Sequence, residues 1–198
     1  MEKSDYLKDY ETHLKTLTEQ GFDIDDERFK YVKGLSMLLM HLHDAIKSML
    51  MIENCERYEE KGSSEEHLLQ QALFRNAVLN YAKCFSQSGK GRVTLDKKNV
   101  FKDAQPLLGT HNKLIDYRNK FFAHSDDSGL DYVSLATKEE SDHIVVKQLY
   151  TIVVPVNEFS AYTTVFKFCG DHVKEKIEKS FRGLEKRCGK RVYGFGQR

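Results

Sequence analysis

The feature that most constrains the fold is a long amphipathic pattern from about Glu27 to Tyr58. Its apolar residues recur at intervals of three and four positions, which is the spacing of one face of an α-helix. They are Val32, Leu35, Leu38, Leu39, Leu42, Ala45, Ile46, Met49 and Ile52. A helix of this length crosses a whole domain, because each residue adds about 1.5 Å. The pattern therefore predicts a central helix of a helical bundle.

Three further long segments have the same period, at about residues 64–85, 107–123 and 158–188. Ser63 and Glu66 can form a capping box that starts the first of them. Its predicted apolar stripe is Leu68 or Leu69, Ala72, Leu79 and Ala82, with Arg75 in the gap. A weaker stripe predicts an N-terminal helix over residues 3–20, and Asp96 can cap a short helix before Pro106.

The period changes after the third of these helices. Residues 131–154 are rich in valine, isoleucine, threonine and tyrosine, with turn residues in the middle. This composition predicts a β-hairpin with strands at about Asp131–Ala136 and His143–Val154. Pro155 would end the second strand.

Composition favours one mainly α domain that spans residues 1–198. Only two prolines accompany twelve glycines, which favours long helices over many turns. We expect the N-terminal helix within 1–22, the bundle core over 27–188 and a basic tail at 189–198. The predicted fold is an up-down bundle of four long helices plus short helices, with the hairpin inserted before the last helix.

Cysteine spacing and hydropathy predict a cytoplasmic protein that does not enter a membrane. The four cysteines show no zinc-site spacing, so they are expected to be reduced thiols, with no metal and no cofactor. The "HLHD" stretch adds too few ligands, because His41 and Asp44 share a helix face while His43 points away. The start of the chain lacks the apolar core of a secretory signal. The net charge of +1 neither requires nor excludes a polyanionic partner.

The helix expected at 107–123 carries polar residues where its apolar stripe has gaps. His111 and Arg118 are seven residues apart and therefore share a face. A guanidinium stays charged, so its burial without an anion would cost several kcal/mol. The partner could be an internal carboxylate such as Asp44 or Glu53, or a bound phosphate. His124 follows Arg118 by six residues, about 240° around a helix, so the two converge only if the helix ends or kinks.

The stretch "RNKFFAH", Arg118 to His124, resembles the R-x(4-6)-H signature of HEPN domains, in which a polar residue directly follows the arginine. HEPN domains are all-α proteins found as ribonuclease toxins, phage abortive-infection factors and RNA-processing or CRISPR-associated nucleases. The phrase "YRNKFFAHSD", followed by a hairpin and a last long helix, is most similar to the AbiU-type abortive-infection branch.

The resemblance implies a metal-independent endoribonuclease, acting in phage defence or as a toxin. Its catalytic residues would be Arg118, Asn119 and His124, and its active site would form where two such helices meet in a homodimer. RNA would be the substrate, and a toxin would also have an antitoxin protein as a partner. Where a partner enzyme neutralises HEPN toxins by adenylylating a tyrosine, that tyrosine lies two residues after the histidine. Here Ser125 and Asp126 follow His124, so that regulation is not expected.

Residue chemistry gives each motif residue a role. The 2′-hydroxyl of RNA attacks its own phosphate, which leaves a 2′,3′-cyclic phosphate and spares DNA. His124 can act as base or acid near neutral pH. Arg118 can bind the phosphate oxygens, and Asn119 can orient His124 or donate to phosphate.

Other residues are weaker candidates. Arg75, Asn76, Lys120 and His111 are possible RNA or phosphate contacts, although an internal salt bridge for Arg75 and a core position for His111 are simpler readings. Some HEPN domains only bind their ligands. A non-catalytic module that binds nucleotide, RNA or protein is therefore the alternative function, and a purely structural bundle with an ion-paired Arg118 is a third.

Overall fold

The computed structural model describes residues 4–54, 64–86, 92–122 and 131–194. Along these ranges the α-helices are α1 Asp5–Glu19, α2 Lys30–Glu53, α3 Ser64–Lys83, α4 Lys97–Val100, α5 Gln105–Asp116 and α6 Phe159–Cys188. Short 3₁₀ helices, η1 Glu27–Phe29 and η3 Val156–Glu158, precede α2 and α6, and a π-helix, η2 Tyr117–Phe122, continues α5. The strands are β1 Asp131–Glu139 and β2 Ile144–Ile152.

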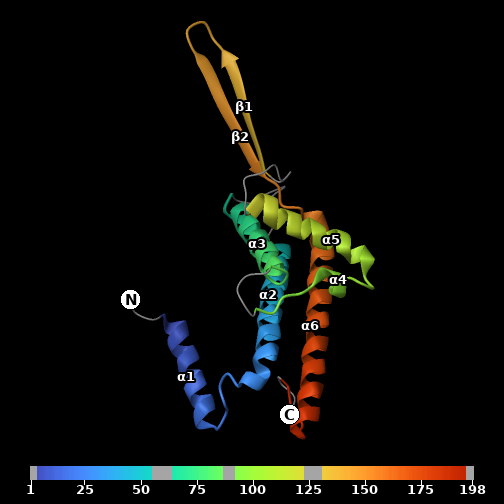
Figure 1. Ribbon diagram of the computed structural model, residues 1–198. Helices are drawn as coiled ribbons and strands as arrows, with labels where there is room; N and C mark the ends of the chain where they lie inside the picture. Colours follow the sequence, from blue (N-terminus) through green and yellow to red (C-terminus); the bar gives the residue numbers. More distant parts are fainter. Residues whose placement is uncertain (1–3, 55–63, 87–91, 123–130, 195–198) are drawn as a thin grey trace.

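The core lies where α2 packs against α3 and α6 (Figure 1). The predicted apolar face of α2 is confirmed, since most of its residues are buried and the others are partly buried against the core. The matching face of α6 includes Tyr162, Phe166, Cys169 and Val173, each fully buried. The molecule is therefore mainly helical, with a two-stranded hairpin before the last helix, as predicted.

The segment Glu27–Glu53 is long and apolar enough to cross a membrane, but 44% of its most apolar window is buried inside the fold. Its buried face meets α3 and α6, so in this structure the segment is the central helix of the bundle.

The buried face of α3 differs from the predicted stripe. Leu68 and Leu69 are 65% and 47% exposed, and Ala72 and Arg75 are also exposed. The core side of the helix consists of Phe74, Ala77, Val78, Tyr81 and Ala82. Phe74 stacks near Phe159 and Tyr162 of α6, and these large rings bury more apolar area than the leucines of the first turn. The correction removes Arg75 from the core.

The N-terminal helix α1 forms as predicted but stands apart from the bundle (Figure 1). None of its residues is buried, and Tyr6 and Tyr10 are 89% and 60% exposed.

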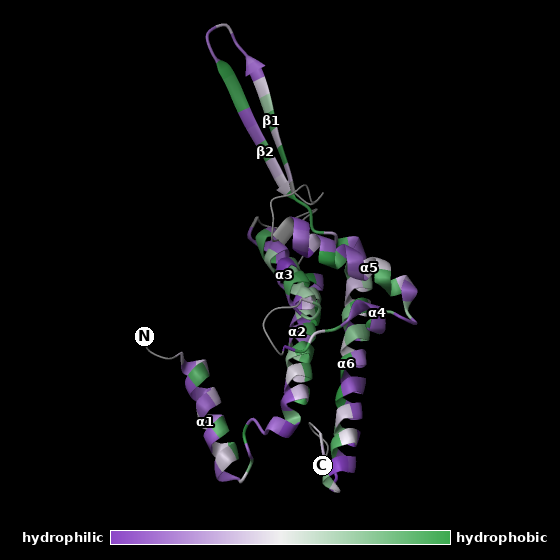
Figure 2. Cartoon of the chain, in the orientation of Figure 1, coloured by the Kyte–Doolittle hydropathy of each residue, from purple (hydrophilic) through white to green (hydrophobic). Residues whose placement is uncertain are grey.

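The hairpin also projects from the bundle, and Figure 2 shows hydrophobic stretches on both strands. Its strands are antiparallel, with Val133 opposite Tyr150 and Leu135 opposite Gln148. The first strand extends to Glu139, three residues beyond the predicted end.

The correction to α3 gives a direct test with one type of substitution at two sites. Leu42→Ala, on the buried face of α2 at 1% exposure, should lower the free energy of unfolding by about 3 kcal/mol because it leaves a cavity. Leu68→Ala should change it by less than about 0.5 kcal/mol. Urea unfolding monitored by circular dichroism measures both, and a large loss from Leu68→Ala would restore the original stripe.

Candidate functional site

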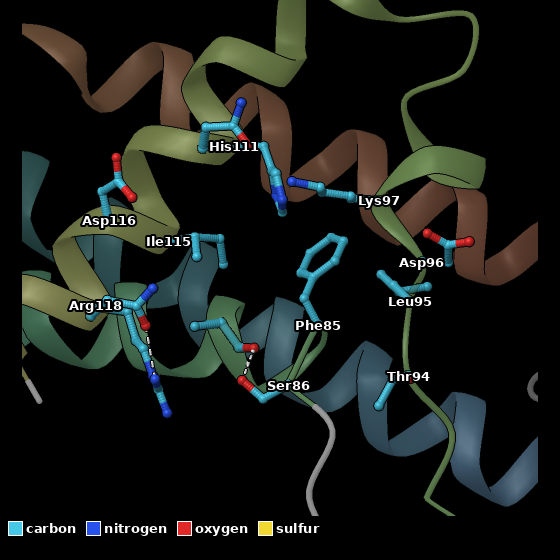
Figure 3. A pocket seen from close by; sticks show the side chains of 13 residues that line it. Phe85, Ser86, Thr94, Leu95, Asp96, Lys97, His111, Ile115, Asp116 and Arg118 are labelled. Carbon is cyan, nitrogen blue, oxygen red and sulfur yellow. Dashed lines mark hydrogen bonds between the residues drawn. The ribbon is translucent and has the colours of Figure 1, made fainter.

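A hollow of about 610 Å³ lies between the end of α3, the segment before α4, and the face of α5 and η2 (Figure 3). Its polar lining groups come from all of these elements. They are Ser86, Thr94, Asp96, Lys97, His111, Asn112, Asp116, Arg118 and Asn119. Phe85, Leu95 and Ile115 supply apolar surface. The volume falls in the range typical of small-ligand sites.

The wall that carries Lys97 is fixed by the chain before α4. The backbone N–H of Leu95 donates to the carbonyl of Cys84 at 2.7 Å, and Leu95 itself is buried. Gly34 of α2 lets this segment come close, because a Cβ there would clash with the side chain of Val93. As predicted, Asp96 caps α4, accepting from the N–H of Lys98 at 3.0 Å.

His111 forms the buried back of the hollow. It is 2% exposed, its Nδ1 lies 2.7 Å from the hydroxyl of Tyr81, and the rings of Phe85 and Phe101 flank it. Burial, together with the charge of Lys97, lowers the pKa of His111 to about 4. Figure 3 shows the ammonium of Lys97 pointing toward the imidazole. His111 is therefore a neutral core histidine that links α5 to α3 at neutral pH.

Arg118 lies on the rim of the same hollow, half-buried, where α5 gives way to η2. Its Nη1 donates to Oδ1 of Asn119 at 2.8 Å (Figure 3). Within the described ranges no carboxylate pairs with Arg118, and the predicted alternative partners Asp44 and Glu53 make no ion pair with it. The guanidinium is thus a cation on an open wall whose one described partner is a neutral amide.

The helix changes from α to π at Tyr117, one residue before the arginine of the motif. A π-helix hydrogen-bonds from i to i+5 and so rotates the following residues relative to an α-helix; such turns are common at functional sites. The ring of Tyr117 packs edge-on against Phe74 of the core, which holds the start of this turn in place. The distortion starts just before Arg118, in the stretch where the helix must end or kink if Arg118 and His124 are to converge.

The other predicted site residues are placed in different ways. His124 lies outside the described residues. Lys120 is exposed on η2. Arg75 lines a separate small hollow with Leu68 and residues 152–154, and Asn76 donates to Oγ of Ser48 at 2.8 Å across the α2–α3 contact. Arg75 and Asn76 therefore do not line the hollow that contains Arg118.

Lys97 is the functional candidate that sequence reasoning missed. In the sequence it belongs to a basic cluster with Arg92 and Lys98, and such a cluster is typical of a solvated surface. The only local signal was the cap at Asp96, which places Lys97 in the first turn of a helix. Its approach to His111, and its place on the same hollow as Arg118, arise from tertiary packing.

The buried thiols and His41, the buried one of the two histidines of α2, have structural positions. Burial raises the pKa of Cys84 and of Cys169 to about 12, so neither is a thiolate at neutral pH. His41 is buried, and its Nε2 lies 3.3 Å from Nη2 of Arg92. Among the described residues no group of three or more histidine, cysteine, aspartate or glutamate side chains could hold a metal ion.

Comparisons of the chain with protein-family models, with curated proteins and with solved structures find no match. A function must therefore be inferred from the chemistry of the hollow and of the motif beside it.

The burial of His111 predicts a pH dependence of stability. Its folded-state pKa of about 4 lies below its ordinary value of 6.5, so the unfolded chain takes up the proton first as pH falls. The stability that neutral His111 contributes is full above pH 6.5 and is lost between pH 6.5 and 4, amounting to about 3 kcal/mol. Urea unfolding across this range should show a steeper loss for wild type than for His111→Gln.

The exposed histidine of α1 supplies a control for the substitution itself, since His13→Gln should leave the free energy of unfolding at neutral pH within about 0.5 kcal/mol of wild type. Equal slopes for wild type and His111→Gln would show that His111 does not titrate as its burial requires.

The open position of Arg118 predicts that it contributes little to stability. Arg118→Ala should change the free energy of unfolding by less than about 0.5 kcal/mol, as for other partly exposed sites. Breaking a buried ion pair would instead cost about 3–5 kcal/mol. A thermal melt and a urea titration of the variant separate the two, and the larger loss would support the purely structural reading.

Proposed function

We propose that the chain is a metal-independent endoribonuclease of the HEPN type, acting in phage defence or as a toxin. The observation that carries the proposal is the position of Arg118, a cation on the wall of an open hollow that has no carboxylate partner among the described residues. A phosphate supplies the anion that such a guanidinium can grip through two parallel hydrogen bonds. The R-x(4-6)-H resemblance supplies the reaction class.

The contact between Arg118 and Asn119 prepares both side chains for an anion. The carbonyl oxygen of Asn119 accepts from Nη1 of Arg118, so the amide NH₂ group of Asn119 is left to donate. Arg118 keeps its remaining N–H groups for phosphate oxygens. Lys97, on the opposite wall, adds a second positive charge as the scissile phosphate becomes more negative in the transition state.

His124 is the acid–base residue in this scheme. His111 is poorly suited to that part near neutral pH, because a pKa lowered to about 4 makes it a weak base with no proton to donate, and its Nδ1 is engaged by Tyr81. His124 removes the proton of the 2′-hydroxyl, which attacks the phosphorus as the bond to the 5′-oxygen breaks. The leaving oxygen needs a proton from an acid, which the second copy of His124 in a homodimer supplies.

A non-catalytic module that binds nucleotide or RNA in the same hollow is the second candidate. It is favoured by the combination of two cations, Arg118 and Lys97, with the ring of Phe85 on one hollow, since an aromatic face and cations together suit a base and its phosphate. The two functions differ in whether bound RNA is cut.

Cleavage of end-labelled total RNA in EDTA tests the proposal. Wild type should cut RNA, leave 2′,3′-cyclic phosphate ends and spare DNA of the same sequence. His124→Ala and Arg118→Ala should each lower the rate by about 10²–10⁴-fold. Arg182→Ala, an exposed arginine on α6, is the matched control and should keep the wild-type rate.

Two results would contradict the nuclease. A wild-type protein that binds RNA without cutting it, in a preparation shown to be dimeric and free of inhibitor, would favour the binding module. Cutting that persists in His124→Ala would mean a different active site.

A further inference from the structure

The two faces of the hairpin differ in chemistry. The register places Val133, Leu135, Ile144, Val146 and Tyr150 on one face, here called the apolar hairpin face. These five side chains are 59–77% exposed. The opposite face, the lysine hairpin face, carries Lys138 and Lys147 among the apolar residues Tyr132, Val145 and Leu149. An antiparallel sheet with this alternation normally packs its apolar face and leaves the other in water.

Nothing in the described part of the chain covers the apolar hairpin face. The hairpin projects beyond the bundle (Figure 1) and forms a sheet of only two strands. An isolated two-stranded hairpin is at best marginally stable in water. An exposed apolar patch of this kind marks an interaction site rather than a free surface.

The apolar hairpin face is large enough for a dimer contact. Both strands are nine residues long, and five large apolar side chains on this face are each more than half exposed. Two copies that pack these faces together would remove the side chains of both from water, and apolar area at the centre of an interface favours association.

We propose that the apolar hairpin face packs against the same face of a second copy of this chain. A two-fold dimer buries one patch on both partners, so the patch must tolerate contact with itself. Among its described side chains, Glu139 at the end of β1 is the only charge, and the centre of the face is uncharged. Because this face has no lysine or arginine, it offers an RNA backbone no cation. The lysines of the opposite face disfavour stacking there.

The proposal does not depend on the ribonuclease, because no residue of the hollow takes part in it. In the proposed dimer the apolar hairpin face is buried and the lysine hairpin face stays exposed to solvent.

A pair of substitutions separates the two faces. Leu135 and Leu149 are 67% and 63% exposed, lie in neighbouring positions of the hairpin and point to opposite faces. Leu135→Lys and Leu149→Lys therefore make the same chemical change with the same loss of strand propensity. Only the first puts a charge into the proposed contact.

Sedimentation equilibrium of the full chain, over roughly 1–100 µM, measures the outcome. Wild type should approach twice the monomer mass of 23.0 kDa. Leu135→Lys should raise the dissociation constant by about 100-fold or more, and Leu149→Lys by less than about threefold. A wild type that stays monomeric throughout, or two variants that weaken association equally, would overturn the proposal.

Amide hydrogen exchange guards against a variant whose hairpin simply unfolds. Hairpin amides of wild type should be protected at high protein concentration and exchange faster on dilution, because the dimer stabilises the strands. Hairpin protection that is independent of concentration would contradict a contact made there. At protein concentrations where wild type is dissociated, thermal melts of both variants should match wild type, since neither leucine belongs to the bundle core.

Discussion

The packing of α2 between α3 and α6 is the constraint on which the rest of the structure depends. This packing brings Tyr81 of α3 and Cys169 of α6 into contact in the core, with Tyr81 Oη 3.9 Å from Cys169 Sγ. His111 of α5 reaches the same space through its hydrogen bond to Tyr81. This contact and the packing of α5 on α6 hold the helix face from which Ile115 and Arg118 line the hollow. The hollow is therefore a consequence of the core.

His111 and Arg118 lie on the same helix face, but one is buried and neutral whereas the other is partly exposed and charged. His111 enters the dry core and remains there by giving up its charge, as its depressed pKa shows. Arg118 cannot lose its charge, and it lies where its guanidinium stays partly in water. The sequence pattern alone treats both as polar insertions in an apolar stripe. Only the depth of each position separates a packing histidine from a cation that can receive a ligand.

Periodicity predicted much of the fold because the strongest apolar patterns coincide with the buried faces. The faces of α2 and α6 follow directly from residue spacing, and the hairpin follows from its composition and its central turn residues. The predicted stripe of α3 was wrong because spacing cannot tell which of several apolar residues packs against another helix. Phe74 and Tyr81 contact rings of α6, whereas Leu68 remains exposed. For the same reason, residue spacing could not predict that Lys97 lines the candidate site. The π turn at Tyr117 could not be predicted from spacing either. The sequence showed only that the helix must end or kink if Arg118 and His124 are to converge.

The proposed dimer contact and the proposed chemistry are linked through the chain itself. His124 precedes Asp131, the first residue of β1, by seven residues, which span at most about 24 Å when extended. Each copy of His124 is thus tethered within that distance of its own hairpin base. A dimer held by two hairpins keeps both tethers at one place, which raises the effective concentration of one histidine near the other. Cleavage by 2′-hydroxyl attack needs a base and an acid, and each chain contributes one motif histidine. The exposed hairpin would then serve the reaction by bringing the second histidine to the site, without any of its own side chains touching RNA.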